Sequence, residues 1–344
     1  MKYSAYLALI PSALASVVPR QDPCQASADG FASLNGGTTG GAGGTVVTVS
    51  TLADLEKYAA AAGPHVIKVE GRITVAPFGK EVSVSSDKTI VGVGEDAEIF
   101  QGGFRLIKVS NVIIRNLIIG HSSDGTDNDY DGIQSDTSSN IWIDHCLFEE
   151  AGDGLVDLRK DTNYFTVSNN IFRKHDKAFG IGWTENVVAR GTIHHNWFDS
   201  TNQRNPSADN LAEAHLYNNL VSGVTSYGHY VRGATTAVIE NVFFEDTKNP
   251  ITRDEGAALR SKGNIFEGTG GTIAKDAGEA FDPASYYSYT LTKTADVPAA
   301  NLNNEVSPIT MLVVRVSEEK NQEKPGPPYE GMPVAEDIMP RVWQ

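Results

Sequence analysis

Aspartates gather in two short stretches of the chain, and their spacing is typical of a site for a cation. Asp129 and Asp131 flank a tyrosine in an acidic loop, and Asp153 and Asp157 enclose the tripeptide Gly-Leu-Val. A single aspartate is usually a solvated loop residue, but a cluster of carboxylates calls for a compensating positive charge. Because side chains alternate along a strand, each of these two pairs would present both carboxylates on one side.

The kind of ligand favours calcium. Calcium is bound by oxygen atoms, whereas zinc and copper take nitrogen and sulfur ligands as well. The chain holds only two cysteines, Cys24 and Cys146, and they do not have the spacing of a zinc site. We therefore predict that Asp129, Asp131 and the pair Asp153 and Asp157 hold one Ca2+.

Two basic residues fall next to this acidic region in the repeat described below. Lys177 ends the tripeptide His-Asp-Lys, and Arg204 lies in Asn-Gln-Arg-Asn-Pro just after a predicted strand. A lone basic residue is most often a surface charge, but coils adjacent to the cluster would bring both to one face. The pair His194 and His195 suggests a metal at first sight. Adjacent strand residues point to opposite faces, so we interpret this pair as structural.

A repeated block predicts how these distant residues come together. Each block has alternating apolar residues, then an asparagine, then an apolar pair, and the blocks recur every 22 to 30 residues. The marked positions are Asn116, Cys146, Asn170, Asn196, Asn219, Asn241 and Asn264, with a cysteine in the asparagine place of the second block. Alternation with period two predicts strands, and the blocks lack the three-and-four spacing of helices.

A strand, a turn at asparagine and another strand describe one coil of a solenoid. We therefore predict an all-β fold, a right-handed parallel β-helix, in which stacked asparagines hydrogen-bond along the axis. We expect Phe172, Trp197 and Phe243 in the core. Residues 50–62 are predicted to form a helix, capped by Ser50 or Thr51, that closes the N-terminal end of the coils.

The remaining patterns divide the chain into three segments. Residues 1–15 have a positive start, an apolar run too short to span a bilayer, and the cleavage pattern Ala-Leu-Ala, which together predict a secretory signal. Residues 16–306 are the predicted β-helix domain. Residues 307–344 lack the repeat and carry Lys-Pro-Gly-Pro-Pro, which predicts a loosely ordered tail. We expect a secreted, extracellular protein in which Cys24 and Cys146 either pair or remain separate thiols.

The charge balance narrows the choice of partner. The chain has 28 basic and 43 acidic residues and a formal net charge of −15. This excludes a nucleic-acid binder, which needs a basic face for the phosphates. An acidic polymer would also be repelled, unless a bound cation reversed the local sign of the charge, as the predicted calcium would.

From about Gly30 to Ala300 the sequence resembles polysaccharide lyase family 1, and in particular the secreted pectate lyases of fungi. The resemblance rests on these motifs: Gly36–Thr45, Val47–Leu52, Trp142-Ile-Asp-His145, Asp153–Asp157, Thr166-Val-Ser-Asn, His175-Asp-Lys177, Arg204-Asn-Pro206 and His215–Asn219. They occur in the order that the family shows.

The resemblance implies calcium-dependent β-elimination in (1→4)-α-D-galacturonan, which leaves a 4,5-unsaturated galacturonate end. It implies that the four aspartates of the cluster bind Ca2+, that Arg204 is the catalytic base and that Lys177 contacts a substrate carboxylate. Calcium would neutralise the carboxylate beside the C5 proton and stabilise the enolate-like transition state as a Lewis acid. The expected partner is polygalacturonate, bound by a monomer with no nucleic acid and no membrane.

One position departs from the family, and three other functions remain open. The family often carries a second arginine five residues after the first, where this chain has Asp209. We expect Arg232 to take over that contact with the substrate. The alternatives are a pectin lyase for methyl-esterified substrate, a polygalacturonase, and a non-catalytic, calcium-stabilised solenoid that binds carbohydrate. The acidic cluster weighs against the first, and the absence of a recognisable acid–base carboxylate motif weighs against the second.

Overall fold

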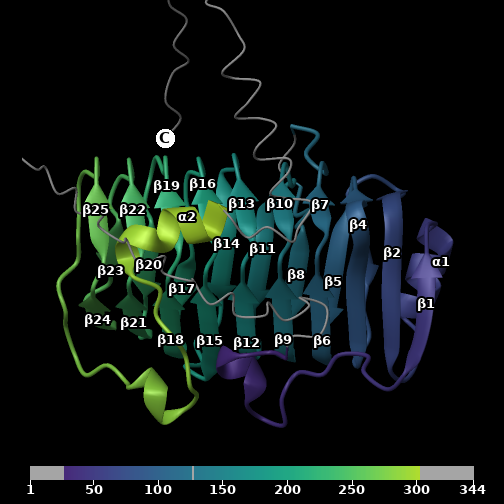
Figure 1. Cartoon of the computed structure of the whole chain (residues 1–344), viewed down its shortest axis with the longest axis horizontal. Coiled ribbons are helices and arrows are strands. Elements are labelled where there is room, and N and C mark those ends of the chain that lie inside the picture. Colours follow the sequence, from purple (N-terminus) through teal and green to yellow (C-terminus); the bar gives the residue numbers. More distant parts are fainter. Residues whose placement is uncertain (1–26, 126–127, 303–344) are drawn as a thin grey trace, which may run out of the picture.

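Three rows of parallel strands run along the protein in the computed structural model, which describes residues 27–125 and 128–302 (Figure 1). Each coil adds one strand to a row, so strands far apart in sequence lie side by side. For example, β9 pairs with β12 and β11 pairs with β14, in parallel and in register. The predicted all-β parallel β-helix is thereby confirmed.

Two of the rows merge in one sheet through the long strands β2 and β4. The first row contains β1 Thr45–Val49, β2 His65–Thr74, β4 Lys88–Phe100, β6 Ser110–Arg115, β9 Ser139–Asp144, β12 Asn163–Ser168, β15 Ala189–His194, β18 Leu211–Tyr217, β21 Thr236–Glu240 and β24 Ala258–Lys262. The second continues from β2 and β4 with β7 Ile118–Gly120, β10 Leu147–Glu149, β13 Ile171–Arg173, β16 Trp197–Asp199, β19 Leu220–Ser222, β22 Phe243–Glu245 and β25 Ile265–Glu267.

The third row is a separate sheet of eight strands. In spatial order it contains β3 Glu81–Ser83, β5 Gly103–Ile107, β8 Ile133–Asp136, β11 Gly154–Arg159, β14 Lys177–Gly182, β17 Ser207–Asp209, β20 His229–Arg232 and β23 Ile251–Arg253. The residues predicted to do chemistry belong to this row or to the turns that lead into it.

Short helices accompany the coils: η2 Gly30–Ser33, α1 Leu52–Ala59, η3 Pro283–Ser285, η4 Thr294–Asp296 and α2 Val297–Leu302. In Figure 1, α1 lies at the end of the stack beside β1. Thr51 is its N-cap and accepts a hydrogen bond from the Asp54 amide at 3.2 Å, while Leu55 and Ala59 are buried. The predicted helix is confirmed over a shorter range, and its role in closing the coils stays a prediction.

A ladder of buried side chains joins the turns between the first and second rows. The amide of Cys146 donates to Asn170 Oδ1 at 2.9 Å, that of Asn170 to Asn196 Oδ1 at 3.0 Å, and that of Asn196 to Asn219 Oδ1 at 3.0 Å. These side chains are fully buried or nearly so, and each carbonyl oxygen satisfies a backbone donor of the coil before it. Cys146 is a free, buried thiol in this row.

Two of the marked asparagines do not belong to the ladder. The strand register places Leu117 and Val242 in the row of Cys146 and Asn170, because Ile118 is in register with Leu147 and Leu220 with Phe243. Asn116 and Asn241 come one residue earlier and have φ values of 53° and 49°. Asparagine tolerates this left-handed turn conformation well, which explains its presence there and the wrong assignment.

Two of the three aromatics predicted in the core, Phe172 and Phe243, are buried, and Trp197 is partly buried. Phe172 stacks on Phe148 and Phe198 at ring distances of 5.3 and 4.8 Å inside the coils. Trp197 and Phe243 instead pack in a separate cluster with Val297 of α2, so they lie outside the coils and beneath that helix.

The motif Trp142–His145 has a structural role. Asp144 is fully buried and accepts hydrogen bonds from Arg115, Ser168 and Asn169 at 2.5 to 3.0 Å, with the His145 ring nitrogen at 2.7 Å. Burial raises the pKa of this carboxyl, but the neighbouring donors, led by His145, outweigh burial and hold it well below the usual range.

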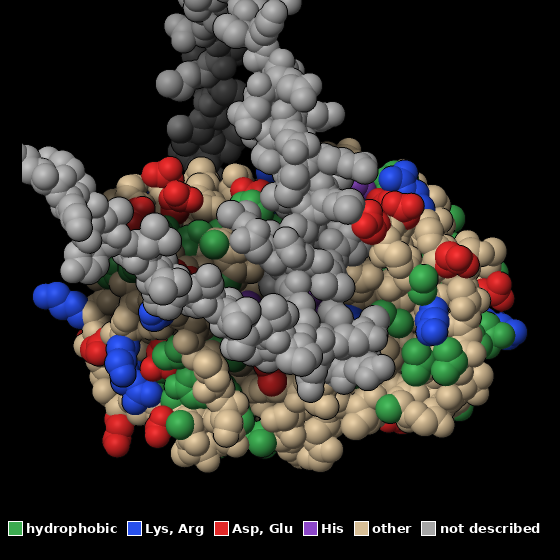
Figure 2. All heavy atoms as spheres, in the orientation of Figure 1, with side chains coloured by type: hydrophobic (Ala, Val, Ile, Leu, Met, Phe, Trp, Pro, Cys, Tyr) green, Lys and Arg blue, Asp and Glu red, His purple; other side chains and the backbone are tan. Residues whose placement is uncertain are grey.

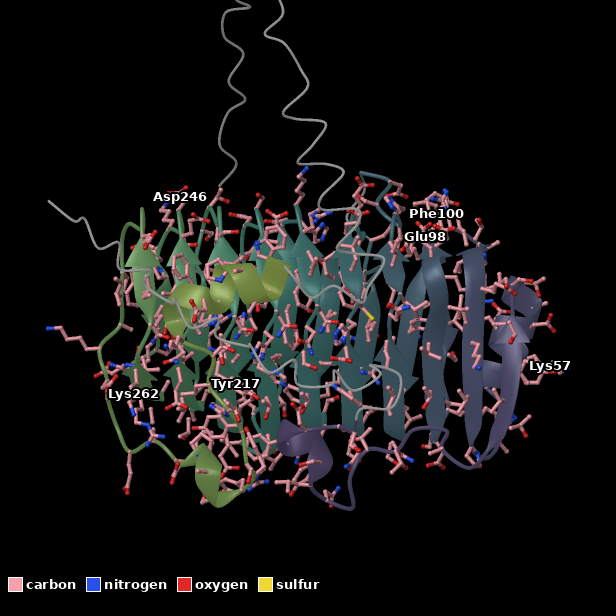
Figure 3. The ribbon with its side chains drawn as sticks, in the orientation of Figure 1. Lys57, Glu98, Phe100, Tyr217, Asp246 and Lys262 are labelled. Atoms are coloured by element: carbon pink, nitrogen blue, oxygen red, sulfur yellow. The ribbon has the colours of Figure 1, made fainter. Side chains whose placement is uncertain are left out.

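The interpretation of the histidine pair as structural fits the geometry, but the reason given for it is wrong. His195 has a φ of 53° and lies in the turn after β15, so it does not alternate with His194 and their Nδ1 atoms are 2.8 Å apart. His194 also lies 3.1 Å from Asp29 and stacks at 4.7 Å on Tyr217, the residue that Figure 3 labels on the lower part of the coils. The pair thus joins the coils to the chain segment before η2.

Several predictions fall outside the described residues: the signal over 1–15, the tail over 307–344, and Cys24. Within residues 27–125 and 128–302, no helix is long and apolar enough to cross a membrane. On the part of the surface that Figure 2 leaves visible, hydrophobic side chains form small separate patches between polar ones.

Candidate metal and substrate site

The candidate site lies on the third row of strands, where four neighbouring coils contribute to it. Asp129 and Asp131 lie in the turn before β8, and Asp153 immediately precedes β11. Lys177 begins β14, and Arg204 lies in the turn before β17. The sequence pattern predicts both aspartate pairs on strands. In the structure, turns hold three of the four, and the stacking of the coils brings them together.

Three of the four predicted calcium ligands converge. Carboxylate oxygens of Asp129, Asp131 and Asp153 all lie within 4.8 Å of one another. Asp131 is buried, and its oxygens accept hydrogen bonds from the Gly154 amide at 2.7 Å and from Gln134 Nε2 at 3.1 Å. These three carboxylates are called the acidic triad below.

The fourth predicted ligand is held apart from the triad. The Asp157 carboxylate is buried in β11 and accepts a hydrogen bond from the Gly180 amide at 3.1 Å. Its other oxygen pairs with Arg204 Nη1, also at 3.1 Å. Asp157 therefore lies on the same side of the coils as the triad, but its carboxylate pairs with Arg204. The sequence pattern did not indicate this ion pair.

The pKa values of the carboxyls at this site indicate an environment that favours a bound cation. Burial, assisted by the charges of Asp129 and Asp153, raises the pKa of Asp131 from 3.8 to about 6. Burial and then the charge of Asp131 raise the pKa of Asp157 well above its usual value. Burial and Asp131 also raise the pKa of Glu81 to about 8, and Glu81 Oε1 is buried without a hydrogen-bond partner. These carboxyl groups repel one another when all are ionised, and a hard divalent cation such as calcium would offset that repulsion and bind their oxygen atoms.

Lys177 and Arg204 both reach these carboxylates. Lys177 Nζ contacts Asp153 Oδ1 directly, and the His175 ring lies 2.6 Å from the Asp153 carbonyl oxygen. Arg204 Nη1 is 3.9 Å from Asp153 Oδ2, besides its closer contact with Asp157. The two predicted cationic residues thus approach different carboxylate oxygens of Asp153, Lys177 at Oδ1 and Arg204 at Oδ2.

Arg232 lies elsewhere on the same sheet. It is in register with Asp209 on the neighbouring strand β17, and its guanidinium lies 5.1 Å from the ring of Tyr230. Within the described residues, no ion pair links Arg232 to the triad. A substrate contact by Arg232 in place of the second arginine therefore stays a prediction. Such a contact would lie further along the coils than the triad.

Three residues of the site carried no signal in the sequence. Glu81 comes from a strand far before the aspartates, and Gln134 follows them as an ordinary strand residue. Trp183 lies 5.0 Å from the Arg204 guanidinium and is 45% exposed. Glu81 and Trp183 reach the site through the stacking of the coils, so spacing along the chain could not reveal them, whereas Gln134 is close to Asp131 in sequence but has no distinctive pattern around it.

A parallel β-helix that places a carboxylate cluster beside a lysine and an arginine on one strand row is the arrangement expected of a polysaccharide lyase. The family described as "Pectate lyase" matches residues 6–307 of the chain. A "Pectate trisaccharide-lyase" of Thermotoga sp. is 35% identical over 78% of this chain and 86% of its own length. "Pectate lyase A" of Emericella nidulans is also 35% identical, over 80% and 84%. The chain belongs to the pectate lyase family.

Solved structures agree with this assignment. The pectate lyase of Bacillus sp. N165, crystallised in complex with trigalacturonate, is 28% identical and aligns with a TM-score of 0.71 over 82% of this chain and 99% of its own. A pectate lyase of Xanthomonas campestris is 27% identical, with a TM-score of 0.67 over 82% and 98%.

Proposed function

We propose that this chain cleaves polygalacturonate by calcium-dependent β-elimination and leaves a 4,5-unsaturated galacturonate end. The observation that carries the proposal is the convergence of the acidic triad with Lys177 and Arg204 on one face of the coils. Membership of the pectate lyase family supports the same reaction.

The residues present fit a bound calcium. The triad would hold it, Asp157 would join once its ion pair with Arg204 opens, and Glu81 would gain a cation near its unpaired oxygen. When bound, calcium would supply Lewis-acid stabilisation of the negative charge that develops on the substrate carboxylate. Four carboxylates without a cation would repel an acidic polymer, so this charge reversal is a requirement for binding as well as for chemistry.

The chain's own residues perform the remaining steps. Lys177 binds a galacturonate carboxylate and orients the sugar. Arg204, in its neutral form, accepts the proton from C5, whose electron pair forms the C4–C5 double bond as the bond from C4 to the glycosidic oxygen breaks. The leaving oxygen takes a proton from water. A guanidinium is normally protonated, so the reaction should accelerate as the pH rises.

The ion pairs of the site suggest why the cation matters to both basic residues. Lys177 and Arg204 are bound to Asp153 and Asp157, which are also the proposed ligands. A cation on these carboxylates would compete with the two side chains and release them toward the substrate. Lysine and arginine are then available for an acidic polymer only when the cation is present.

Further parts of the proposal rest on sequence patterns. We infer that residues 1–15 direct secretion, that residues 16–306 form the lyase domain and that 307–344 form a separate tail. We also infer an extracellular enzyme of the fungal type, acting as a monomer, with Arg232 contacting the polymer beyond Asp209.

The choice of substrate separates this function from its alternatives. The purified protein is given polygalacturonate and highly methyl-esterified pectin, each with calcium or with chelator, and ultraviolet absorbance and reducing ends are followed. Calcium-dependent absorbance on polygalacturonate supports the proposal. Absorbance on esterified pectin in chelator would indicate a pectin lyase, new reducing ends without absorbance a hydrolase, and neither signal a binding protein.

A further inference from the structure

Trp183 has an unusual environment for a tryptophan. It directly follows β14, at the turn that ends each strand of the third row, and it is 45% exposed. The equivalent turns of the neighbouring coils hold Lys160 and Asn210, which bind polar partners: Lys160 contacts Asp136 and Asn210 contacts the Thr184 carbonyl, both at 2.7 Å. A small or polar residue therefore satisfies the fold at this position, and the indole needs another explanation.

The indole folds back over the strand instead of pointing away from it. A Cβ atom on Gly180 would overlap Trp183 Cη2 and lie 2.6 Å from Asp157 Oδ1. The absence of a side chain on Gly180 thus makes room for the ring. Gly180 is in register with Asp157 on one side and Ser207 on the other. The indole ring therefore lies over the third row of strands, next to the Asp157 carboxylate that binds Arg204.

Trp183 and Arg204 approach from opposite ends of their strands. Trp183 follows the end of β14, whereas Arg204 precedes the start of β17, and they meet with the guanidinium carbon 5.0 Å from the ring centroid. Arg204 also binds Asp157 at 3.1 Å. The result is an exposed aromatic surface directly beside the residue that is proposed to take the proton.

We propose that Trp183 is the stacking platform for one galacturonate ring of the bound polysaccharide. This ring neighbours the sugar from which Arg204 takes the C5 proton. A pyranose ring presents a face of C–H groups, while its hydroxyls and carboxylate project at the edges. The face packs against indole and removes apolar surface from water, and the edge groups remain free for the cation and for Lys177. This inference rests on the proposed function, since it assigns a subsite of that same groove.

The same geometry would also allow Trp183 to act only by positioning Arg204, and kinetic measurements distinguish the two roles. If Trp183 only held the Arg204 guanidinium in place, its loss would reduce turnover and shift the pH profile, with little change in affinity. A stacking platform binds the ground state and the transition state alike, so its loss raises KM and largely spares kcat.

The test compares Trp183→Ala with Trp183→Phe and with Val187→Ala, a matched control that removes exposed apolar surface from the same loop. For Trp183→Ala we expect KM for polygalacturonate to rise about tenfold, with kcat changed by less than about threefold. Trp183→Phe should keep most of the affinity, and Val187→Ala should behave as wild type. A fall in kcat at unchanged KM, or an effect of Val187→Ala equal to that of Trp183→Ala, would overturn the proposal.

A second measurement does not depend on turnover or on the alanine variant folding. Acrylamide quenching of tryptophan fluorescence is measured by stopped flow with and without hexagalacturonate and calcium, in the wild type and in Trp183→Phe. The ligand should protect a fluorescent component that is missing in Trp183→Phe. Binding without such protection would refute the stacking role, even if the lyase assay succeeded. Protection in a protein without lyase activity would instead retain Trp183 as a platform and reject the proposed reaction.

Discussion

Replacing Asp131 with asparagine should stabilise the calcium-free protein and abolish its stabilisation by calcium. Folding raises the pKa of Asp131 from 3.8 to about 6, so the folded protein holds this proton more tightly than the unfolded chain. The favourable contribution of the protonated carboxyl is therefore present below about pH 4 and is lost as the pH rises through 6. At pH 8 the ionised carboxylate lowers the free energy of unfolding by about 3 kcal/mol relative to the protonated form, since each pKa unit corresponds to about 1.4 kcal/mol.

Asparagine removes this charge and keeps most of the contacts. Its oxygen can accept from the Gly154 amide, and the Gln134 amide can rotate to accept from its nitrogen. In chelator at pH 8 we expect Asp131→Asn to raise the free energy of unfolding by about 1 to 3 kcal/mol, which raises the melting temperature by roughly 2 °C per kcal/mol. With calcium, the wild type should gain stability and the variant should not.

Asp136→Asn, at the end of β8, the strand that follows Asp131, is the matched control. Burial raises the pKa of Asp136, but hydrogen bonds from Arg159 and Lys160 outweigh burial and lower it, so this substitution should destabilise the protein. The measurement is thermal unfolding followed by circular dichroism, in chelator and in calcium, from pH 4 to pH 8. A calcium-free Asp131→Asn protein that melts below the wild type at pH 8 would refute the reasoning about the triad.

Further outcomes follow from the same site and fold. Arg204→Lys should lose at least about a hundredfold in kcat and keep its affinity for polygalacturonate, because lysine preserves the charge but not the planar fork; unchanged turnover at saturation would remove Arg204 as the base. Asp153→Asn or Asp157→Asn should weaken calcium binding, measured by calorimetry, about tenfold or more while the circular dichroism stays native; an unfolded variant would show a structural role instead. The apparent calcium affinity should fall below about pH 6, as Asp131 binds a proton, and an affinity independent of pH from 5 to 8 would contradict this. Asn196→Ala should lower the free energy of unfolding by about 2 to 4 kcal/mol, because it leaves a buried amide without its acceptor; a loss no larger than that of the exposed Asn186→Ala would argue against the ladder.

The fold was predictable because one local rule repeats. The alternation of apolar residues and the recurring asparagine identify a coil, and the coil determines the solenoid. The rule did not separate two neighbouring turn positions, since asparagine suits both the buried ladder at Asn170 and the left-handed turn at Asn116. A pattern of residue types identifies the coil but not which of two adjacent side chains points inward.

The site was predictable only where its residues cluster in the chain. Asp129, Asp131 and Asp153 stood out because they recur at short spacing, and the structure brings them together. Glu81 reaches the same face from a strand far earlier in the chain and Trp183 from the opposite end of β14 to Lys177, and both positions depend on the register between strands. That register is a property of the stacked backbone, so no local motif indicates it.

The central claim is tested most directly by counting products. The wild-type protein is incubated with polygalacturonate in calcium at alkaline pH, and unsaturated ends, measured by ultraviolet absorbance, are compared with new reducing ends. Elimination predicts one unsaturated end for every new reducing end, no product of either kind after exhaustive chelation, and recovery when calcium is returned. Reducing ends without unsaturated ends, or full activity in chelator, would contradict calcium-dependent β-elimination by this protein.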